Sequence, residues 1–186
     1  MIDTSEFRSG LRIMFKDTPY EIIEFQHIKP GKGQAFVRTR LKNIEIGNVL
    51  EHNFRAGEKV EEADIEEKNM QFLYKEADDF HFMDLDNYEQ VIIPAKRVKE
   101  AANYLKEQLE VTILFYKNQA ISIILPFFVS LKVIKAEPGT RGDTVTSGSK
   151  PVTLETGAVI SVPLFINEGD IITIDTRTGE YIGRES

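Results

Sequence analysis

The feature that most constrains the fold of this 186-residue chain is a succession of short apolar runs separated by turn residues. Residues 11–15 and 20–25 flank Lys16-Asp17-Thr18-Pro19, which predicts a β-hairpin. Residues 34–41 alternate, with Val37 and Leu41 on one face and Arg38 and Arg40 on the other. Only residues 96–109 space their apolar side chains as a helix does. Short strands with turns between them predict an all-β protein built of small barrels or sandwiches.

The predicted strands fall into three sets, which gives the domains 1–64, 65–128 and 129–186. The candidate strands are residues 11–15, 20–25, 34–41, 49–54 and 60–65, then 70–74, 80–84, 111–116 and 120–125, and finally 129–135, 152–154, 159–165, 171–175 and 181–182. A domain of about 60 residues buries only about 60% of the surface of its unfolded chain. We therefore expect packing between neighbouring barrels to contribute to stability.

The composition excludes several classes of protein. The chain has no cysteine, which rules out disulfides, thiolate zinc sites, iron–sulfur clusters and a cysteine nucleophile, and fits a reducing compartment. Residues 1–7 contain Asp3 and Glu6 and no apolar core, so they do not form a signal peptide. The longest uncharged stretch, residues 118–131, is interrupted by Pro126 and is shorter than the ~20 residues of a membrane span. The expected location is the cytoplasm, with no membrane partner.

The formal net charge of −7 conceals a difference between the three parts. Residues 1–60 carry a net charge of +2, residues 61–128 carry −7, and residues 129–186 carry −2. Residues 28–44 contain no acid, and the basic residues there are Lys29, Lys32, Arg38, Arg40 and Lys42. Because salt screens charges beyond about 8 Å, a ligand at this patch would respond to the patch more than to the acidic middle. The patch is either a nucleic-acid contact or a solvated basic surface.

The search for catalytic and metal-binding motifs finds none. The three histidines, His27, His52 and His81, lack metal-ligand spacing. No spacing of residues suggests a nucleophile with its base and orienting group. The sequence therefore predicts no catalytic residue, no metal and no cofactor.

One loop has an unusual composition. Its residues are Lys29, Pro30, Gly31, Lys32 and Gly33. Proline fixes one torsion angle and glycine permits left-handed ones, so this segment predicts a tight tip between two strands with a lysine at its apex. Such a lysine, beside Arg38 and Arg40, could reach into a phosphate-lined cleft. The alternative interpretation is that Lys32 is an ordinary exposed lysine in a loop.

Several motifs together resemble the bacterial elongation factor P family over essentially the whole chain. The similar segments are residues 9–13 (Ser-Gly-Leu-Arg-Ile), 29–36 (Lys-Pro-Gly-Lys-Gly-Gln-Ala-Phe), 71–74 (Gln-Phe-Leu-Tyr), 82–84 (Phe-Met-Asp), 141–144 (Arg-Gly-Asp-Thr), 159–163 (Val-Ile-Ser-Val-Pro) and 174–181 (Ile-Asp-Thr-Arg-Thr-Gly-Glu-Tyr). The resemblance implies an SH3-like, or KOW-like, first barrel and two OB-fold-like barrels, in an L that resembles tRNA. It also implies a monomer that is not an enzyme.

The resemblance further implies a function. Members of the family bind the 70S ribosome between the peptidyl-tRNA site and the exit site, contact rRNA, ribosomal proteins and the P-site peptidyl-tRNA, and relieve stalling at consecutive prolines. Lys32 matches the family's modified lysine, which implies a modifying enzyme as a second partner. Family members with an unmodified lysine can carry a proline after the second glycine, and Gln34 stands there in this chain, which favours modification.

The resemblance also implies sites in the last domain. Gly142, Asp143 and Thr144 match a segment near the exit-site codon. Tyr181 and Arg184 match a terminal Tyr-x-x-Arg that faces the small subunit and the anticodon stem.

Three other hypotheses remain open. Lys32 could serve an enzyme as a Schiff-base or general-base lysine, although an exposed tip is a poor place for the burial that such a lysine needs. The chain could be a generic RNA-binding scaffold of barrels. It could also be a related ribosomal factor without proline specificity. We expect the acidic segment 61–89 to face ribosomal protein or solvent rather than rRNA.

Overall fold

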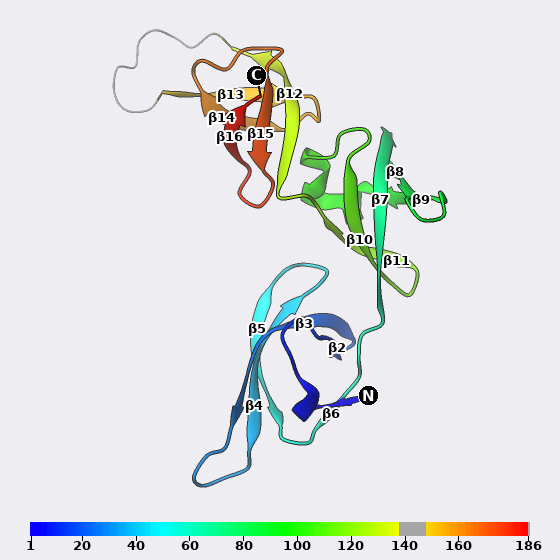
Figure 1. The fold of residues 1–186 in the computed structure, drawn as a ribbon, viewed down its shortest axis with the longest axis vertical. Coiled ribbons are helices and arrows are strands. Elements are labelled where there is room, and N and C mark those ends of the chain that lie inside the picture. The colour runs from blue at the N-terminus through cyan, green and yellow to red at the C-terminus, as the bar shows by residue number, and fades with distance from the viewer. Residues whose placement is uncertain (138–147, 186) are drawn as a thin grey trace. The chain divides into compact units, whose positions relative to one another are not determined.

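The computed structural model describes residues 1–137 and 148–185 of the chain. Within these ranges strands dominate, and helical structure is limited to three short segments. The strands form one four-stranded sheet, two five-stranded sheets and a two-stranded pair. Figure 1 labels most of these strands along the chain. The sheets close into barrels or half-barrels, which confirms the predicted all-β fold.

The amino-terminal sheet has the order β2-β3-β4-β5. Its strands are β2 (Arg12–Phe15), β3 (Thr18–Ile28), β4 (Phe36–Asn43) and β5 (Val49–Arg55), and beside them β1 (Ile2–Asp3) pairs with β6 (Lys59–Val60), with a 3-10 turn at Thr4–Glu6. The predicted first hairpin is present, but its turn is shorter than expected. Lys16 and Asp17 have φ values of 51° and 60°, and Thr18 already pairs with Phe15. Positive φ at both central residues matches the right-handed twist of the two strands, so a two-residue turn suffices.

The alternation predicted for residues 34–41 is confirmed in β4. Val37 and Leu41 are buried, whereas Arg38 is exposed and Arg40 half-buried. The buried face joins a core made of Phe7, Leu11, Ile13, Ile22, Val37, Leu41, Phe54 and Val60. Burying each side chain of this size contributes about 1.5–3 kcal/mol relative to leaving it in water. One face of β4 therefore lies in the core, and the residues of the other face are exposed or half-buried.

The middle sheet has the order β11-β10-β7-β8-β9. Its strands are β7 (Ile65–Glu76), β8 (Asp79–Asp84), β9 (Gln90–Pro94), β10 (Glu110–Tyr116) and β11 (Gln119–Ile124). The helix predicted over residues 96–109 is much shorter, because α1 spans only Ala95–Val98 and a 3-10 helix follows at Lys99–Asn103. Lys99 has a φ of 53°, which interrupts the right-handed helix. Val98 and Leu105 are nevertheless buried. The spacing of the apolar residues therefore indicated correctly which side chains are buried, but not that they lie on one continuous helix.

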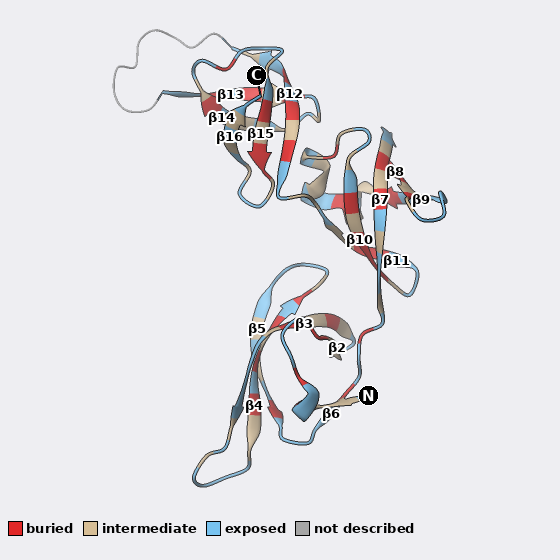
Figure 2. Ribbon diagram, viewed as in Figure 1, coloured by how far each residue is buried: buried red, intermediate tan, exposed pale blue. Residues whose placement is uncertain are grey.

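The carboxy-terminal sheet has the order β14-β13-β12-β15-β16. Its strands are β12 (Phe128–Ala136), β13 (Ser149–Leu154), β14 (Val159–Pro163), β15 (Ile171–Asp175) and β16 (Glu180–Arg184). Figure 2 shows buried residues of β12 and β15 in red. The core consists of Val129, Leu131, Val133, Val152, Leu154, Val162, Ile166, Ile172 and Ile174. The turn glycines Gly169 and Gly179 have φ values of 91° and 76°, which glycine adopts at no steric cost.

Spatial proximity divides the chain into two units, residues 1–67 with 114–122, and residues 68–113 with 123–186. Within the second unit, Tyr104 and Leu109 pack against the carboxy-terminal core. The Thr156 hydroxyl donates to the Asn103 carbonyl at 2.7 Å, and the Lys106 ammonium donates to the Ser130 carbonyl at 2.7 Å. Apolar surface and hydrogen bonds therefore connect the residues after β9 to the last sheet. None of the helices in the described ranges is long and apolar enough to cross a membrane.

Candidate functional site

The Lys32 loop joins β3 to β4, and Figure 1 shows it extending past the end of this hairpin. Ile28 and Phe36 form the last strand pair before it. Lys32 and both neighbouring glycines are exposed, and Pro30 is half-buried. Among the described residues, Lys32 forms no ion pair and no side-chain hydrogen bond. The loop therefore presents an ammonium group to solvent with all its donors available.

The backbone fixes the shape of this loop. Gly33 has a φ of 115°, which a residue with a side chain rarely adopts. A Cβ at Gly33 would lie 3.7 Å from Cγ of Pro30, so the proline ring packs close to this glycine. At the base of the loop, the Ala56 N–H donates to the Ala35 carbonyl at 3.0 Å, which fastens the loop to the end of β5. The sequence predicted this tight tip, and the structure confirms its position between two strands.

Two of the three basic residues of β4 lie opposite acidic residues that are distant in sequence, and one of them is Lys42, which lies opposite Glu21. Arg40 lies opposite Glu24 on β3 and Glu51 on β5, and its Nη1 donates to Glu24 at 2.9 Å. Arg38 lies opposite Gln26 and Asn53, which carry no charge. The segment that contains no acid in sequence is therefore partly neutralised in space. Arg38, Lys29 and Lys42 remain exposed on this part of the molecule.

The two candidate residues on β16, Tyr181 and Arg184, lie in different environments. Tyr181 is half-buried and packs against the carboxy-terminal core, which gives it a structural role. Arg184 is about half exposed, its Nη1 lies 3.7 Å from Oδ2 of Asp170, and its guanidinium carbon lies 5.8 Å from the ring centroid of Phe165. Gly142, Asp143 and Thr144 lie outside the described residues.

The sequence analysis missed a strong charge pair beside β15. Nε and Nη2 of Arg177 donate to the two carboxylate oxygens of Asp175 at 2.9 and 2.6 Å. These side-chain hydrogen bonds, supported by one from the Arg177 backbone N–H, lower the pKa of Asp175 from 3.8 to about 2. The same guanidinium lies 4.7 Å from the centroid of Phe127. The only sequence signal was an Asp-x-Arg at the end of a predicted strand, which is too common to indicate a pair.

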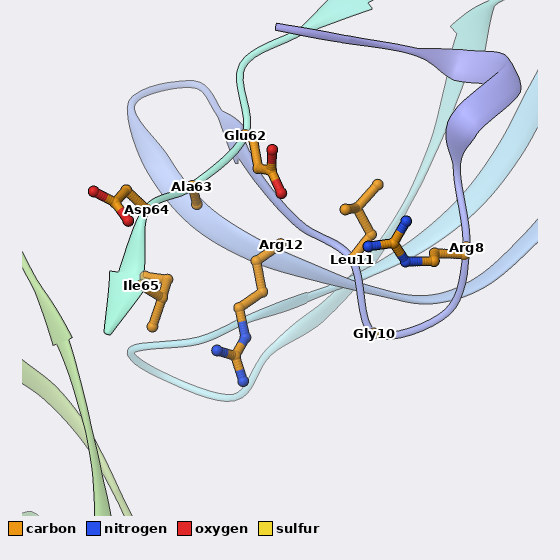
Figure 3. Close-up of a pocket in the computed structure, with 8 residues that line it drawn as sticks. All are labelled: Arg8, Gly10, Leu11, Arg12, Glu62, Ala63, Asp64 and Ile65. Carbon is orange, nitrogen blue, oxygen red and sulfur yellow. The ribbon is translucent and has the colours of Figure 1, made fainter. Parts of the chain in front are cut away.

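A hollow of about 560 Å³ lies beside the connector that follows β6. It is lined by Arg8, Gly10, Leu11, Arg12, Glu62, Ala63, Asp64 and Ile65. Figure 3 shows Arg12 extending between the connector residues and Arg8. Arg12 pairs with Glu67, and its backbone carbonyl accepts from the Ala63 N–H at 3.0 Å. These contacts fasten the connector to β2, so the hollow is part of a structural attachment.

Within residues 1–137 and 148–185, no three His, Asp or Glu side chains gather closely enough to hold a metal ion. The exposed lysine tip and the accessible arginines can bind phosphate oxygens through charge-assisted hydrogen bonds. This chemistry fits recognition of a nucleic acid.

In comparisons with known proteins, three consecutive parts of the chain match domains of one family. Three family models match, namely the elongation factor P KOW-like domain at residues 3–60, the elongation factor P OB domain at residues 65–123, and the elongation factor P carboxy-terminal domain at residues 129–184. A curated relative from Caldanaerobacter subterraneus, named elongation factor P, is 55% identical over 184 residues, covering 99% of this chain and 100% of the relative. A relative of the same name from Synechococcus is 53% identical over 185 residues, covering all of both chains.

A solved structure adds a more distant likeness. The eukaryotic translation initiation factor 5A from Methanococcus jannaschii superposes with a TM-score of 0.53 and 27% identity, covering 67% of this chain and 93% of its own. Together, the three matched domains, the full-length relatives and the lysine-tipped amino-terminal barrel lead to one assignment. This chain belongs to the elongation factor P family of translation factors.

Proposed function

We propose that this protein binds the ribosome between the P and E sites and stimulates peptide-bond formation at consecutive prolines. In this proposal Lys32 approaches the peptidyl-transferase centre, carries a covalent modification added by a partner enzyme, and stabilises the peptidyl-tRNA. The supporting observation is an exposed lysine without a partner among the described residues, held at the end of a hairpin whose base is fastened to β5.

The physical reason lies in the chemistry of proline. Its ring fixes φ and stiffens the chain, so reaction depends on how the ends of the two substrates are held. Orienting reactants can lower a barrier by as much as about 7–11 kcal/mol. A tenfold gain in rate needs only about 1.4 kcal/mol. A factor that orients the peptidyl-tRNA can therefore relieve a stall without supplying an acid, a base or a nucleophile.

The remaining parts of the proposal follow from this one. The protein acts as a monomer in the cytoplasm, with domains at 1–64, 65–128 and 129–186, and it is not an enzyme. Lys29, Arg38, Arg40 and Lys42 contact RNA near the tip, and Gly142, Asp143 and Thr144 lie near the exit-site codon. Tyr181 and Arg184 face the small subunit and the anticodon stem of the bound tRNA. The acidic middle domain faces ribosomal protein or solvent, because rRNA would repel it.

A Schiff-base role for Lys32 is less well supported. Such a lysine is activated by burial or by cationic neighbours. Lys32 is exposed between two exposed glycines. Borohydride trapping with carbonyl substrates would leave a covalent adduct on Lys32 if that chemistry occurred.

The test is the rate of synthesis of a short peptide with three consecutive prolines on purified ribosomes. The protein is purified from its own host, so that Lys32 keeps whatever group it carries. We expect acceleration on this template, none on a proline-free template, and loss of the effect in Lys32→Ala. Lys135→Ala removes another exposed lysine, in β12, and should keep full activity. Equal rates with and without the wild-type protein would refute the proline function and leave a general RNA-binding scaffold.

A further inference from the structure

Phe165 is a large apolar side chain displayed on a rigid segment. Phe165 is 58% exposed, while the next residue, Ile166, is completely buried. The Asn167 side-chain amide donates to the Phe165 carbonyl at 3.1 Å, and the Asn167 N–H donates to Asp170 at 2.8 Å. The backbone around Phe165 is therefore anchored by the core on one side and by a hydrogen-bonded turn on the other. An exposed ring held in this way is available to a partner.

Arg184 lies beside this ring. Its guanidinium carbon is 5.8 Å from the ring centroid, a distance at which a cation is attracted to an aromatic ring. Its Nη1 is 3.7 Å from the nearest oxygen of Asp170, which is longer than a hydrogen bond. Among the described residues, Arg184 donates no side-chain hydrogen bond. Asp170 therefore orients the guanidinium while leaving its donors unused.

Arg177 provides the contrast within the same sheet. Its guanidinium also lies over an aromatic ring, that of Phe127, at 4.7 Å. However, two of its nitrogens already donate to Asp175 at 2.9 and 2.6 Å. Two of the three guanidinium nitrogens of Arg177 thus donate within the protein, whereas among the described residues none of those of Arg184 does.

We propose that Phe165 and Arg184 together bind one nucleotide of an unpaired RNA segment. The base stacks on the exposed Phe165 ring, and the guanidinium donates to the adjoining phosphate. Stacking on aromatic rings and a donor fork that matches phosphate are two of the means by which proteins hold single-stranded RNA. The inference rests on the proposed function for the source of the RNA, which is the ribosome with its bound tRNA.

The proposed site holds one guanidinium, that of Arg184, so it contacts about one phosphate. Residues 129–186 carry a net charge of −2. Each phosphate contact contributes about 0.7–0.9 to the slope of log affinity against log salt concentration. Stacking contributes no comparable term. The two residues should therefore be distinguishable by the salt dependence of binding.

The experiment measures the dissociation constant for purified 70S ribosomes at several salt concentrations. Phe165→Leu should weaken binding by about 5- to 100-fold with an unchanged salt slope. Phe165→Tyr, which keeps the ring, should bind like the wild type. Arg184→Ala should weaken binding and reduce the slope by about one. Phe127→Leu is the matched control, because Phe127 is also an exposed phenylalanine beside an arginine, and it should leave affinity unchanged.

A second measurement identifies the class of partner. With p-benzoyl-phenylalanine at position 165, irradiation on the ribosome should attach the protein to RNA. Attachment to a ribosomal protein instead would overturn the inference, as would wild-type affinity in Phe165→Leu. All variants are first compared by thermal unfolding.

The two proposals can fail separately. If Phe165→Leu loses ribosome affinity while the wild type gives no acceleration on the proline template, the inference stands and the proline function is refuted. If the wild type accelerates synthesis on that template and Phe165→Leu binds ribosomes normally, the proline function stands and the inference about Phe165 and Arg184 is refuted.

Discussion

The guanidinium of Arg177 and the carboxylate of Asp175 form two parallel hydrogen bonds across a single intervening residue, Thr176. Thr176 is itself held, since its hydroxyl donates to the Pro126 carbonyl at 2.6 Å and its N–H donates to the Phe127 carbonyl at 2.9 Å. The end of β15 is thereby fixed to the segment that leads into β12. The charge pair is part of this attachment and gives it a dependence on pH.

The first prediction concerns that dependence. The pKa of Asp175 is lowered from 3.8 to about 2 by hydrogen bonds from Arg177, so the unfolded chain takes up a proton at a higher pH than the folded one. The stabilisation is therefore complete above pH ~4 and is lost as the pH falls from about 4 to about 2. Urea unfolding of the wild type and of Arg177→Gln should give a stability difference that is constant at neutral pH and shrinks across this interval. A difference that stays constant down to pH ~2 would contradict the assignment.

The second prediction concerns the Lys32 loop. Gly33→Ala forces a side chain into a left-handed backbone with a φ of 115°, which costs roughly 1–2 kcal/mol unless the loop rearranges. We expect the loop to rearrange, with nearly unchanged thermal unfolding and a clear fall in synthesis on the proline template. Gly31→Ala is the control, because a Cβ there meets nothing within 4 Å and the backbone does not require glycine. Equal activity in the two variants would show that the shape of the loop is unimportant.

The third prediction concerns the connector after β6. Arg12 pairs with Glu67, whose side chain is 50% exposed. Exposed ion pairs contribute about 0.2–1 kcal/mol, so Glu67→Gln should lower the free energy of unfolding by no more than this. The loss should disappear in 1 M salt, where the screening length is only about 3 Å. A larger loss that is independent of salt would indicate that Glu67 acts through packing.

The fourth prediction concerns the carboxy-terminal core. Leu154 is fully buried, and Leu154→Ala should lower the free energy of unfolding by about 2–5 kcal/mol. Ile182 is 54% exposed in the same sheet, and Ile182→Ala should change it by no more than about 0.5 kcal/mol. Denaturant titration of both variants checks the pair. Similar losses in the two would mean that the outer face of β16 is buried in solution.

The strand pattern was predictable because it depends on neighbours in sequence. The alternation along β4 follows from the pleat of a single strand, and the turn residues indicated the first hairpin, although not that its turn is only Lys16 and Asp17. The helix over residues 96–109 was wrong in extent for a related reason. Apolar side chains at helical spacing also arise when successive short turns each direct one residue into a core, as Val98 and Leu105 do.

The electrostatics of the candidate site were less predictable. Whether Arg40 is available depends on Glu24, sixteen positions away, and on the register that brings β3 beside β4. Arg184 and Phe165 meet only because β16 closes near the segment after β14. Such contacts are decided by strand pairing, which one sequence specifies only when its register is known.

The exposed position of Lys32 separates the chemistry of the tip from the stability of the barrel. Its side chain has no hydrogen bond or ion pair within the described part of the chain, and it is not part of the hydrophobic core of the amino-terminal barrel. A group attached to its Nζ would extend into solvent, and the barrel would fold alike with or without it. The same barrel can thus carry different groups on Lys32. The length and charge of such a group can vary without any compensating change in the hydrophobic core.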